Sequence, residues 1–281
     1  MNPQTSALRM GRFMTTVKYV LLILGAFIVF FPFLWMLTTS LKTVGESISI
    51  PPTLLPEKLQ WENFQTAWNM APFPRYFGNT ILIAVVGTLL TVTITIFAAY
   101  AFTVFRFRGK SLLFMVYLST MMIPTELLLI QNYVTVTKMG LIDTYVGIIL
   151  PTLASGFYTF MLREYFMQVP SSLYKAAKMD GCSNWRYLWK VMVPINRNAI
   201  ATVTILCFIT QWNAFVWPLM VTTSDEHRVL ATGLMYFNLS ASSAVNLQMA
   251  ATTIVVAPMV VFYCVFRRQI VSGIARGGIK G

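Results

Sequence analysis

The chain has 281 residues, of which 57% are hydrophobic and 11% are charged. Soluble domains normally carry about 25% charged residues, so this composition excludes a soluble globule and places the chain in a lipid bilayer. The net charge of +12 does not indicate nucleic-acid binding, because the basic residues lie between apolar runs and not along one polar stripe.

Neither the first apolar run nor the three cysteines point to a specific chemical function. The run is longer than the core of a signal peptide and is not followed by a small-x-small cleavage site, so we expect it to remain as a membrane anchor. Cys182, Cys207 and Cys264 are far apart and belong to no Cys/His cluster. They indicate neither a disulfide framework nor a metal site.

Apolar segments long enough to cross a bilayer recur along the chain. A spanning helix needs about 20 mainly apolar residues. The segments that qualify to within a few residues are 18–40, 79–103, 112–134, 141–162, 199–222 and 247–267. The prolines within them are Pro32, Pro124, Pro151, Pro218 and Pro258. Because a proline frees a backbone carbonyl that must find another partner inside a membrane, these prolines favour kinked helices around a pathway.

The distribution of Lys and Arg predicts the orientation, because cytoplasmic loops retain the positive excess. With the N-terminus inside, the basic residues left outside are Lys42, Lys58, Arg75, Lys138 and Arg228, and the other sixteen of the 21 are inside. The prediction is an all-α polytopic membrane helix bundle with six transmembrane helices and cytoplasmic N- and C-termini. Its parts are an N-terminal segment (1–17), a transmembrane domain (18–267) with a cytoplasmic loop (163–198), and a C-terminal tail (268–281).

The largest predicted outside segment, 41–78, contains five prolines, which limit long helices there. An ordered cap, a loop that contacts a partner and a plain linker all remain open for it.

The cytoplasmic loop between spans four and five contains two short helical patterns. Ser171 and Ser172 are suitable N-caps for the first, and Gly181 suits a left-handed position after its end. Ala176 and Ala177 present a small surface on this helix, and its polar residues are Lys175, Lys178 and Asp180.

A second helix is predicted to begin near Ser183 or Asn184 and to end at Pro194. Its apolar stripe at helical spacing is formed by Trp185, Leu188, Trp189 and Met192. Both helices are too short to be stable alone in water, so we expect the second to pack on its own membrane domain. The first then remains available to a partner.

Polar and aromatic residues within the spans are candidates for a solute pathway. Glu126 is an ionisable group at membrane depth, where such groups are often functional, and Gln131 lies close to it in sequence. A position facing the pathway, a helix cap and a place at the outer interface all remain open for Glu126. Trp212, Asn213 and Trp217 combine aromatic faces with an amide, as sugar sites do, but the tryptophans also suit an interfacial belt or helix packing.

No pattern in the chain indicates an enzyme. The sequence "RGKS", which ends at Ser111, resembles part of a phosphate loop, but Val104 stands where that loop needs a glycine. The single histidine, His227, lies in a predicted external loop beside Asp225 and Glu226 and is interpreted as a surface residue. No catalytic residue is identified.

The stretch "KAAKMDGCSNWRYLWKVMVP" resembles the cytoplasmic loop signature of the permease subunits of ATP-binding-cassette importers. In register with that signature stand Ala176, Ala177, Gly181, Val191, Val193 and Pro194. Asp180 also fits the usual form, whereas Lys175 stands where the family usually has glutamate. The stretches "NTILIA", "RFRGKSLLF", "QWNAFVWPL" and "VSGIARGGIKG" resemble the carbohydrate-uptake branch, specifically the smaller maltose- or glycerol-phosphate-type permease, over about residues 75–281.

The resemblance implies a mechanism and a set of partners. The loop would be a coupling helix seated on an ATPase subunit, with Lys175, Ala176, Ala177, Asp180, Gly181 and Pro194 as its key residues. A second permease subunit, an ATPase dimer, an external solute-binding protein and membrane lipid are the implied partners, in a bacterial inner membrane. ATP and Mg²⁺ would be bound by the ATPase subunits, with no cofactor in this chain. A sugar or oligosaccharide is the expected solute, a glycerol phosphate is the alternative, and an ion-coupled secondary transporter is the remoter one.

Overall fold

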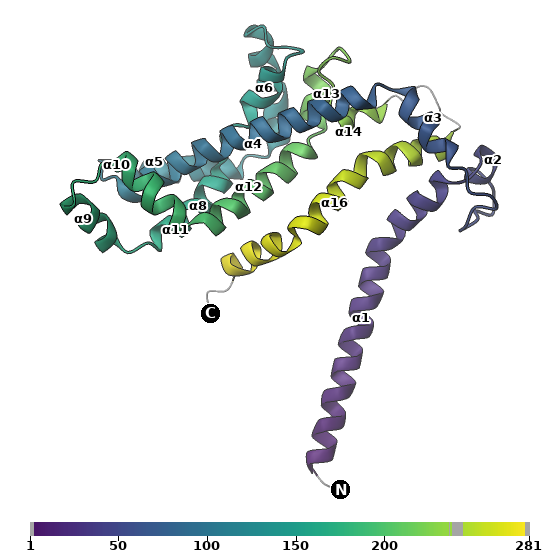
Figure 1. Ribbon diagram of the computed structural model, residues 1–281, viewed down its shortest axis with the longest axis horizontal. Helices are drawn as coiled ribbons and strands as arrows, with labels where there is room; N and C mark the ends of the chain where they lie inside the picture. Colours follow the sequence, from purple (N-terminus) through teal and green to yellow (C-terminus); the bar gives the residue numbers. More distant parts are fainter. Residues whose placement is uncertain (1–2, 236, 238–243, 279–281) are drawn as a thin grey trace. The chain divides into compact units, whose positions relative to one another are not determined.

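The computed structural model describes the backbone of residues 3–235, 237 and 244–278, and these residues form helices and connecting segments without a strand. The chain divides into two compact units, Met1–Ala71 with Leu234–Val256, and Pro72–Gly233 with Ala257–Gly281 (Figure 1). The predicted all-α class is confirmed. We call these parts unit one and unit two.

Unit one contains a long apolar helix, α1 (Pro3–Ser40), followed by the short helices α2 (Val44–Ser47) and α3 (Glu62–Met70). All side chains of residues 14–34 are exposed, although this part of α1 is long and apolar enough to cross a membrane. Such a helix is suited to face lipid or another membrane protein.

The segment that follows α1 is ordered by its own contacts, which excludes the plain linker among the alternatives that the sequence left open. Lys42 is buried, donates from Nζ to the carbonyl of Thr53, and lies with Nζ 4.7 Å from the centre of the Trp35 ring. The Asn63 amide donates to the carbonyl of Lys42 at 2.8 Å, and the Asn246 amide reaches the same carbonyl at 3.2 Å. These bonds hold residues 41–71 in a fixed conformation.

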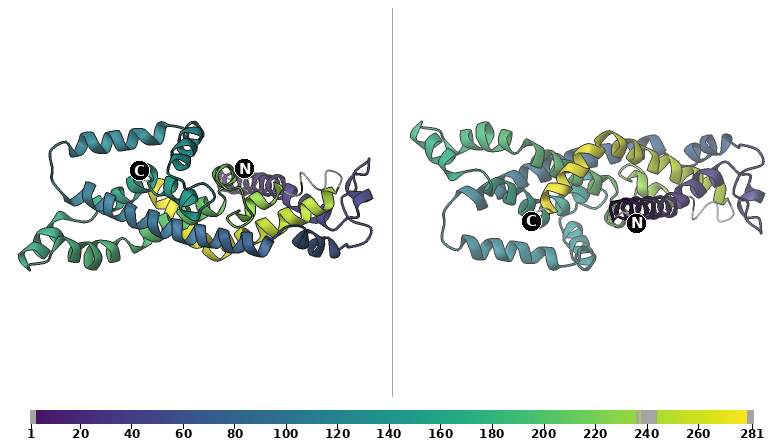
Figure 2. Two further views of the ribbon diagram at one scale, coloured as in Figure 1. Left: turned by 90° about the horizontal axis from the view of Figure 1, so that it is seen from above. Right: turned by 90° about the horizontal axis from the view of Figure 1, so that it is seen from below.

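Unit two is built around α4 (Phe73–Val104), which packs against α8 (Gly156–Met167) and α12 (Arg197–Trp212) (Figures 1 and 2). Its hydrophobic core lies toward the ends of α4 and α8 that precede the loops 105–109 and 168–170. The core residues from these three helices include Ala99, Tyr100, Leu162, Phe166 and Val203. Further core residues come from the predicted cytoplasmic loop.

Small residues allow α4 and α12 to approach closely. Gly87, Thr91, Thr95 and Ala99 follow an i, i+4 spacing and are buried along one face of α4. A Cβ added at Gly87 would lie only 3.1 Å from Nε2 of Gln211 on α12. Small residues at such spacing are typical of helix contacts in membranes, where backbones must come close to gain packing energy.

Three predicted spans are not single straight helices. The span predicted over 112–134 consists of α5 (Lys110–Ser119), a 3₁₀ turn (Thr120–Met122) and α6 (Thr125–Lys138), with a bend of 99° before α6. The break falls at Pro124, which is the N-cap of α6. The kink predicted at Pro124 is confirmed, although hydropathy alone gives neither the angle of the bend nor the break between two separate helices.

The other two broken spans also contain a proline. The span 141–162 consists of α7 (Tyr145–Ile149), a 3₁₀ turn (Leu150–Thr152) and α8, with a bend of 51°. The span 199–222 ends its first helix at Trp212 and resumes as α13 (Val216–Val221). The remaining elements are α9 (Ser171–Met179), α10 (Asn184–Tyr187), a π-helical segment (Leu188–Met192), α11 (Val193–Ile195), α14 (Leu230–Gly233) and α16 (Val245–Gly278), which contributes to both units.

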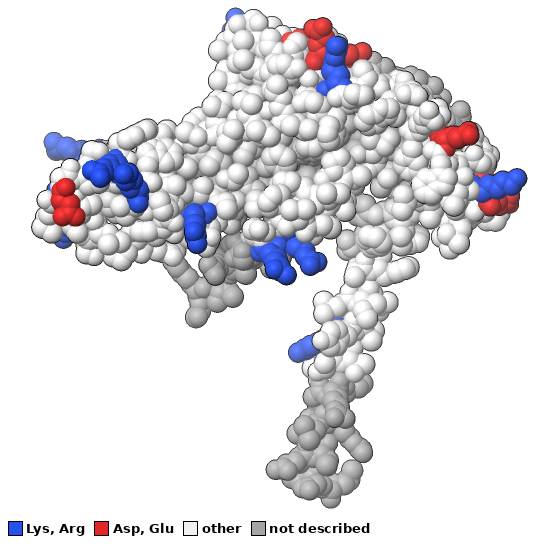
Figure 3. All heavy atoms as spheres, in the orientation of Figure 1, with Lys and Arg blue, Asp and Glu red and all other residues white. Residues whose placement is uncertain are grey.

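By length and composition, three described helices can cross a membrane, or up to six if each bent pair counts as one span. The third such pair is Asn184–Ile195 with Arg197–Trp212, which meet at 82°, and not the two helices of the predicted span 199–222. α16 continues past the predicted end of the last span to Gly278, and residues 279–281 of the predicted tail lie outside the described residues. Lys and Arg side chains lie at the end of unit two that carries α9 and α10 and at places along the lower edge of the view, whereas the broad face above that edge is uncharged (Figure 3).

Candidate functional site

The helix α9 is an exposed element with a firmly defined end. None of its nine residues is buried. After it, Gly181 has φ +72°, its N–H donates to the carbonyl of Lys178 at 3.1 Å, and the N–H of Cys182 donates to the carbonyl of Ala177 at 2.8 Å. This pair of bonds is a Schellman motif, and the left-handed position predicted for Gly181 is confirmed. The predicted N-caps are wrong, because Pro170 is the N-cap and no side chain caps this end.

Two tyrosines fix α9 to the rest of unit two. The Tyr174 hydroxyl donates to Oδ1 of Asn184 at 2.9 Å, and the Tyr100 hydroxyl of α4 donates to the Asn184 carbonyl at 3.1 Å. The Tyr174 ring packs edge-on against Tyr187, with centroids 5.1 Å apart. The exposed helix is therefore connected through Asn184 to the longest helix of the unit.

The second helix of the loop 163–198 begins where the sequence predicts. Ser183 is its N-cap and accepts from the N–H of Arg186 at 3.2 Å. Pro194 does not end the helix, which continues through α11 to Ile195. The preceding segment Leu188–Met192 is π-helical, and this wider turn leaves room for the proline ring that an α-helical turn would exclude. The predicted end is therefore corrected.

Only part of the predicted apolar stripe is buried. Leu188 and Met192 lie in the core of unit two, together with Tyr187, which was not predicted there. Trp185 is 64% exposed and Trp189 is 38% exposed. Both tryptophan rings instead lie against Phe97 of α4, at centroid distances of 5.7 and 6.1 Å.

The remaining residues of the first helix offer a surface to a partner. Ala176 is exposed, and Ala177 is partly buried against the core. Lys178 donates from Nζ to the carbonyl of Cys182 at 3.1 Å. Lys175 and Asp180 are both exposed, and within the described residues no carboxylate forms an ion pair with Lys175.

Two of the pathway candidates lie on α6 and are exposed. Glu126 is in the first turn of α6, immediately after the 99° bend, where a carboxylate interacts favourably with the helix dipole. Gln131 lies about one and a half turns further along the same helix. The structure therefore places Glu126 at the start of a helix that follows a break in the span.

The other three candidates lie at the break between α12 and α13. The Trp212 ring packs edge-on against Phe77 of α4, with centroids 5.8 Å apart. Asn213 is exposed and donates from its amide to the carbonyl of Ile209 at 3.0 Å. Trp217 donates from Nε1 to the carbonyl of Ile148 at 3.1 Å. Among the described residues, no hydrogen bond or ring contact joins this group to Glu126 or Gln131, although α13 packs against α6.

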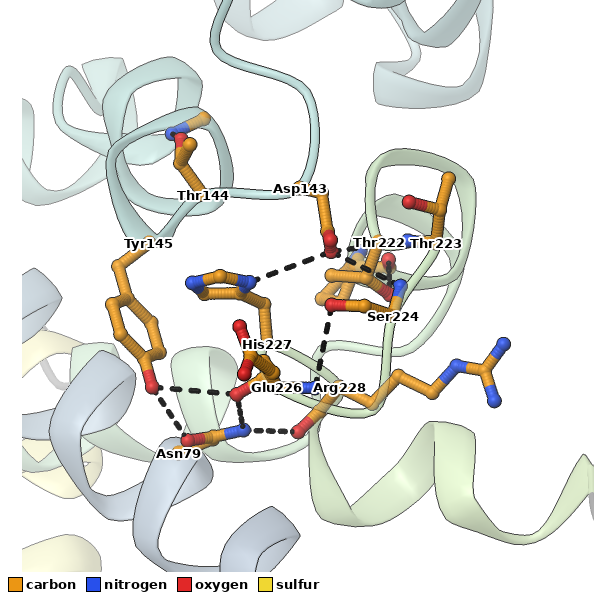
Figure 4. A network of polar contacts seen from close by, with 12 residues as sticks. Asn79, Asp143, Thr144, Tyr145, Thr222, Thr223, Ser224, Glu226, His227 and Arg228 are labelled. Atoms are coloured by element: carbon orange, nitrogen blue, oxygen red, sulfur yellow. Dashed lines mark hydrogen bonds and ion pairs between the residues drawn. The ribbon is translucent and has the colours of Figure 1, made fainter.

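A polar network that the sequence did not predict fixes the loop after α13 (Figure 4). Asp143 has φ +57° and accepts at Oδ1 from the N–H of Thr223 at 3.1 Å and of Ser224 at 3.3 Å. His227 Nδ1 lies 3.5 Å from the same oxygen. Partial burial acts to raise the pKa of Asp143, but the hydrogen bonds from Ser224 and Thr223 and the nearby His227 hold it below its usual value.

The same loop is also bound to α4. The Asn79 amide donates to the carbonyls of Glu226 at 2.7 Å and Arg228 at 2.8 Å, and the Tyr145 hydroxyl donates to Oδ1 of Asn79 at 2.8 Å. The partners in these contacts are 66 to 149 residues apart in sequence. No local pattern joins them, although Asn79 begins the stretch "NTILIA".

Comparison with known proteins gives consistent matches over most of the chain. The family described as "Binding-protein-dependent transport system inner membrane component" matches residues 91–276. The diacetylchitobiose uptake system permease protein NgcG of Streptomyces coelicolor is 32% identical, over 94% of this chain and 88% of that protein. The arabinooligosaccharides transport system permease protein AraQ of Halalkalibacterium halodurans is 30% identical, over 91% and 93%.

A glycerol-phosphate protein and a solved structure are also similar. The sn-glycerol-3-phosphate transport system permease protein UgpE of Yersinia enterocolitica is 28% identical, over 91% of this chain and 94% of that protein. A chain in the crystal structure of a bacterial ABC transporter involved in alginate import superposes with a TM-score of 0.82 at 23% identity, over 92% of this chain and 97% of that chain. The latter match shows the same fold.

Proposed function

Because this chain belongs to the family of binding-protein-dependent transport system inner membrane components, we propose that it forms half of the solute pathway of an ATP-driven importer and receives the motion of an ATPase through α9. The chain is a multi-pass membrane permease subunit. We further propose that the chain crosses the membrane six times, that its N- and C-termini are cytoplasmic, and that the loop 163–198 couples it to the ATPase.

The observation that carries the coupling role is that α9 is exposed and yet fixed. An element that docks into another subunit must leave its surface free, and one that transmits a displacement must be joined firmly to what it moves. α9 has no buried residue, while Tyr174 and Gly181 hold its two halves in place. Both requirements are met on one short helix.

The partners follow from this role. An ATPase dimer that binds ATP and Mg²⁺ would close on ATP binding and carry α9 with it, and the membrane domain would change from inward-open to outward-open. The ATPase can bias that equilibrium only by interacting differently with the two states. A second permease subunit would supply the other half of the pathway, and an external solute-binding protein would deliver the solute. The family match favours this importer over an ion-coupled secondary transporter.

Lys175 would place a positive charge in the proposed contact between α9 and the ATPase. It is exposed, without an ion pair among the described residues, and it stands where the signature usually has glutamate. Ala176 beside it leaves room for close approach. We therefore expect the cleft of the ATPase partner to present a carboxylate to Lys175.

The expected solute is a sugar or an oligosaccharide. Two similar permeases are named for diacetylchitobiose and arabinooligosaccharides. A glycerol phosphate is the second candidate, supported by the similarity to a glycerol-3-phosphate permease. Trp212, Asn213 and Trp217 at the α12–α13 break, with Glu126 and Gln131 on α6, are the residues proposed for the pathway.

Cysteine crosslinking in membranes tests the coupling role. Cys182 and Cys264 are not buried, so both are first replaced by serine, and single cysteines are then placed at Lys175, Met179 and, as the control, Lys190. We expect a crosslink from the first two positions to a copurifying ATPase subunit, with a yield that changes on addition of ATP. Lys190 is exposed on the second helix and should give much less.

Two results would contradict the proposal. One is equal crosslinking from Lys190 and from the α9 positions, which would place the contact elsewhere. The other is the absence of any ATPase subunit from the purified, transport-active protein.

A further inference from the structure

A cavity with a basic rim lies at the end of unit two that carries α9. Its volume is about 630 Å³, within the range of small-molecule sites. It is bounded by the end of α4, the loop that follows it, the end of α8 and the first half of α9. The lining residues that bear on its chemistry are Arg106, Lys110, Lys175, Phe166, Tyr187 and Met192. The first three are basic, and the other three form a buried apolar wall.

The charge of this cavity is not balanced within the chain. Its described lining contains no Asp or Glu. The nearby Glu164 is paired with Arg163 at 3.1 Å, and no ion pair among the described residues involves Arg106. Lys110 donates from Nζ to the carbonyls of Thr103 and Phe105 at 3.1 and 2.8 Å. Because an ammonium has three donors, one N–H of Lys110 remains for a ligand.

The cavity lies at the level expected for lipid headgroups. Trp185 and Trp189 are exposed and lie against Phe97 of α4, about two turns before α4 ends. Tryptophan side chains of this kind mark the membrane interface. Arg106 follows the end of α4 directly, so its side chain is on the polar side of that interface. In the proposed topology this is the cytoplasmic leaflet.

We propose that this cavity binds the phosphate headgroup of an anionic phospholipid of the cytoplasmic leaflet. Arg106 and Lys110 would hold the phosphate, and the exposed apolar side chains of Phe105 and Met167 at the cavity wall would accompany the first part of the acyl chains. Ser171 and Tyr174 of α9 also line the cavity, so the bound lipid would lie between this helix and the end of α4. The inference rests on the proposed topology, but it does not require the ATPase.

Lipid retention by the purified full-length protein, in complex with its companion subunits, tests the site. The protein is exchanged into nanodiscs that contain equal amounts of phosphatidylglycerol and phosphatidylcholine, and the lipids retained after release are counted by native mass spectrometry. We expect preferential retention of phosphatidylglycerol, about fivefold weaker in Arg106→Gln, because each basic residue near the surface contributes measurably to anionic lipid binding.

The loop supplies a matched control. Arg108 is two residues from Arg106 and is exposed, but it does not line the cavity, so Arg108→Gln should retain phosphatidylglycerol like the wild type. Arg106→Lys, which keeps the charge, should also retain it. Equal retention of the two lipids by the wild type, or an equal loss in both glutamine variants, would overturn the proposal.

Acetylation of Lys110, whose third N–H is proposed to contact the phosphate, is compared in the complex before and after removal of the ATPase subunits and separates the other possible occupants. Protection by phosphatidylglycerol without the ATPase supports the lipid. Protection by inorganic phosphate alone would identify a soluble anion, and protection that requires the ATPase would identify a protein segment; either result overturns the proposal. ATP-driven uptake measured on the same preparations reports on the importer function independently, so the two proposals can fail separately.

Discussion

Replacement of Gly181 tests how strongly the end of α9 determines coupling. Its φ of +72° lies in the left-handed region, and a Cβ added there would meet no atom within 4 Å. Gly181→Ala therefore introduces no clash and isolates the cost of the backbone conformation. For an L-residue this cost is about 1–2 kcal/mol, and asparagine tolerates the region better. Gly181→Pro is more severe, because it fixes φ near −65° and removes the N–H that bonds to Lys178.

Hydrogen exchange measures this cost directly. The amide of Cys182 donates to Ala177 at 2.8 Å as part of the Schellman motif. A loss of 1–2 kcal/mol corresponds to a factor of about 5–30 in the equilibrium between closed and open states. We expect exchange at Cys182 to accelerate by that factor in Gly181→Ala and by less in Gly181→Asn.

Transport should follow the same order. In reconstituted vesicles with the companion subunits, we expect ATP-driven uptake to fall from wild type through Gly181→Asn and Gly181→Ala to Gly181→Pro, which should abolish it while the protein remains in the membrane. Gly140→Ala is the control, since Gly140 also has a positive φ of +69° and open space at its Cβ but lies in a different loop. Wild-type uptake by Gly181→Pro, or equal losses in Gly140→Ala and Gly181→Ala, would refute the reasoning.

Two further predictions concern charged side chains. Lys175→Glu should lower ATP-stimulated uptake more strongly than Lys190→Glu, because only Lys175 is expected to face a carboxylate of the ATPase, and vesicle uptake with both variants measures this; equal effects would contradict it. Asp143→Gly, which keeps the positive φ but removes the acceptor of two backbone N–H bonds, should increase proteolysis of the loop around Ser224, whereas Asp143→Asn, which keeps an oxygen acceptor, should do so less. Folding lowers the pKa of Asp143. The stabilisation that its carboxylate gives to the loop is therefore fully present above the usual pKa of about 3.9, and it is lost as the pH falls through the lower pKa of the folded state. Protection of the wild-type loop should therefore not decrease between pH 8 and 5, and a loss already at pH 6 would contradict the assignment.

Local sequence signals predicted the loop helices well. The length of α9, the left-handed Gly181 and the N-cap at Ser183 each depend on residues within one or two turns. Their physical causes are backbone conformation and side-chain capping, which the sequence displays directly. Pro194 misled the prediction because a π-helical turn before it accommodates the ring.

The bend angles of the broken spans and the polar network of Asp143 and Asn79 required three-dimensional information. Residues 112–134 are apolar on both sides of Pro124, so hydropathy predicts one helix whether it is straight or bends by 99°. The bond between Asn79 and Arg228 joins residues 149 positions apart. An asparagine in an apolar helix predicts only that its amide needs a partner, and the choice of partner depends on how the helices pack.

The two halves of the loop 163–198 differ in a way that bears on the proposed coupling. Residues of the second half, Tyr187, Leu188 and Met192, share one core with Ala99 of α4 and Val203 of α12. Close-packed side chains transmit displacement because they cannot be compressed appreciably. We therefore expect a displacement of the second helix to move the ends of α4 and α12 with it.

The first half contributes no fully buried residue to this core and contacts it only at its edge, through Tyr174 and Ala177. It is also joined to the second half at Asn184, which accepts from Tyr174 of α9 and from Tyr100 of α4. A force applied to α9 therefore reaches α4 through these edge contacts and through the two hydrogen bonds to Asn184. If coupling follows this route, loss of either hydroxyl group weakens the connection without changing the docking surface. The exposed surface of α9 can then be matched to a particular ATPase, as the lysine at position 175 in place of the usual glutamate indicates. The bonds at Asn184 that join α9 to α4 do not have to change with it.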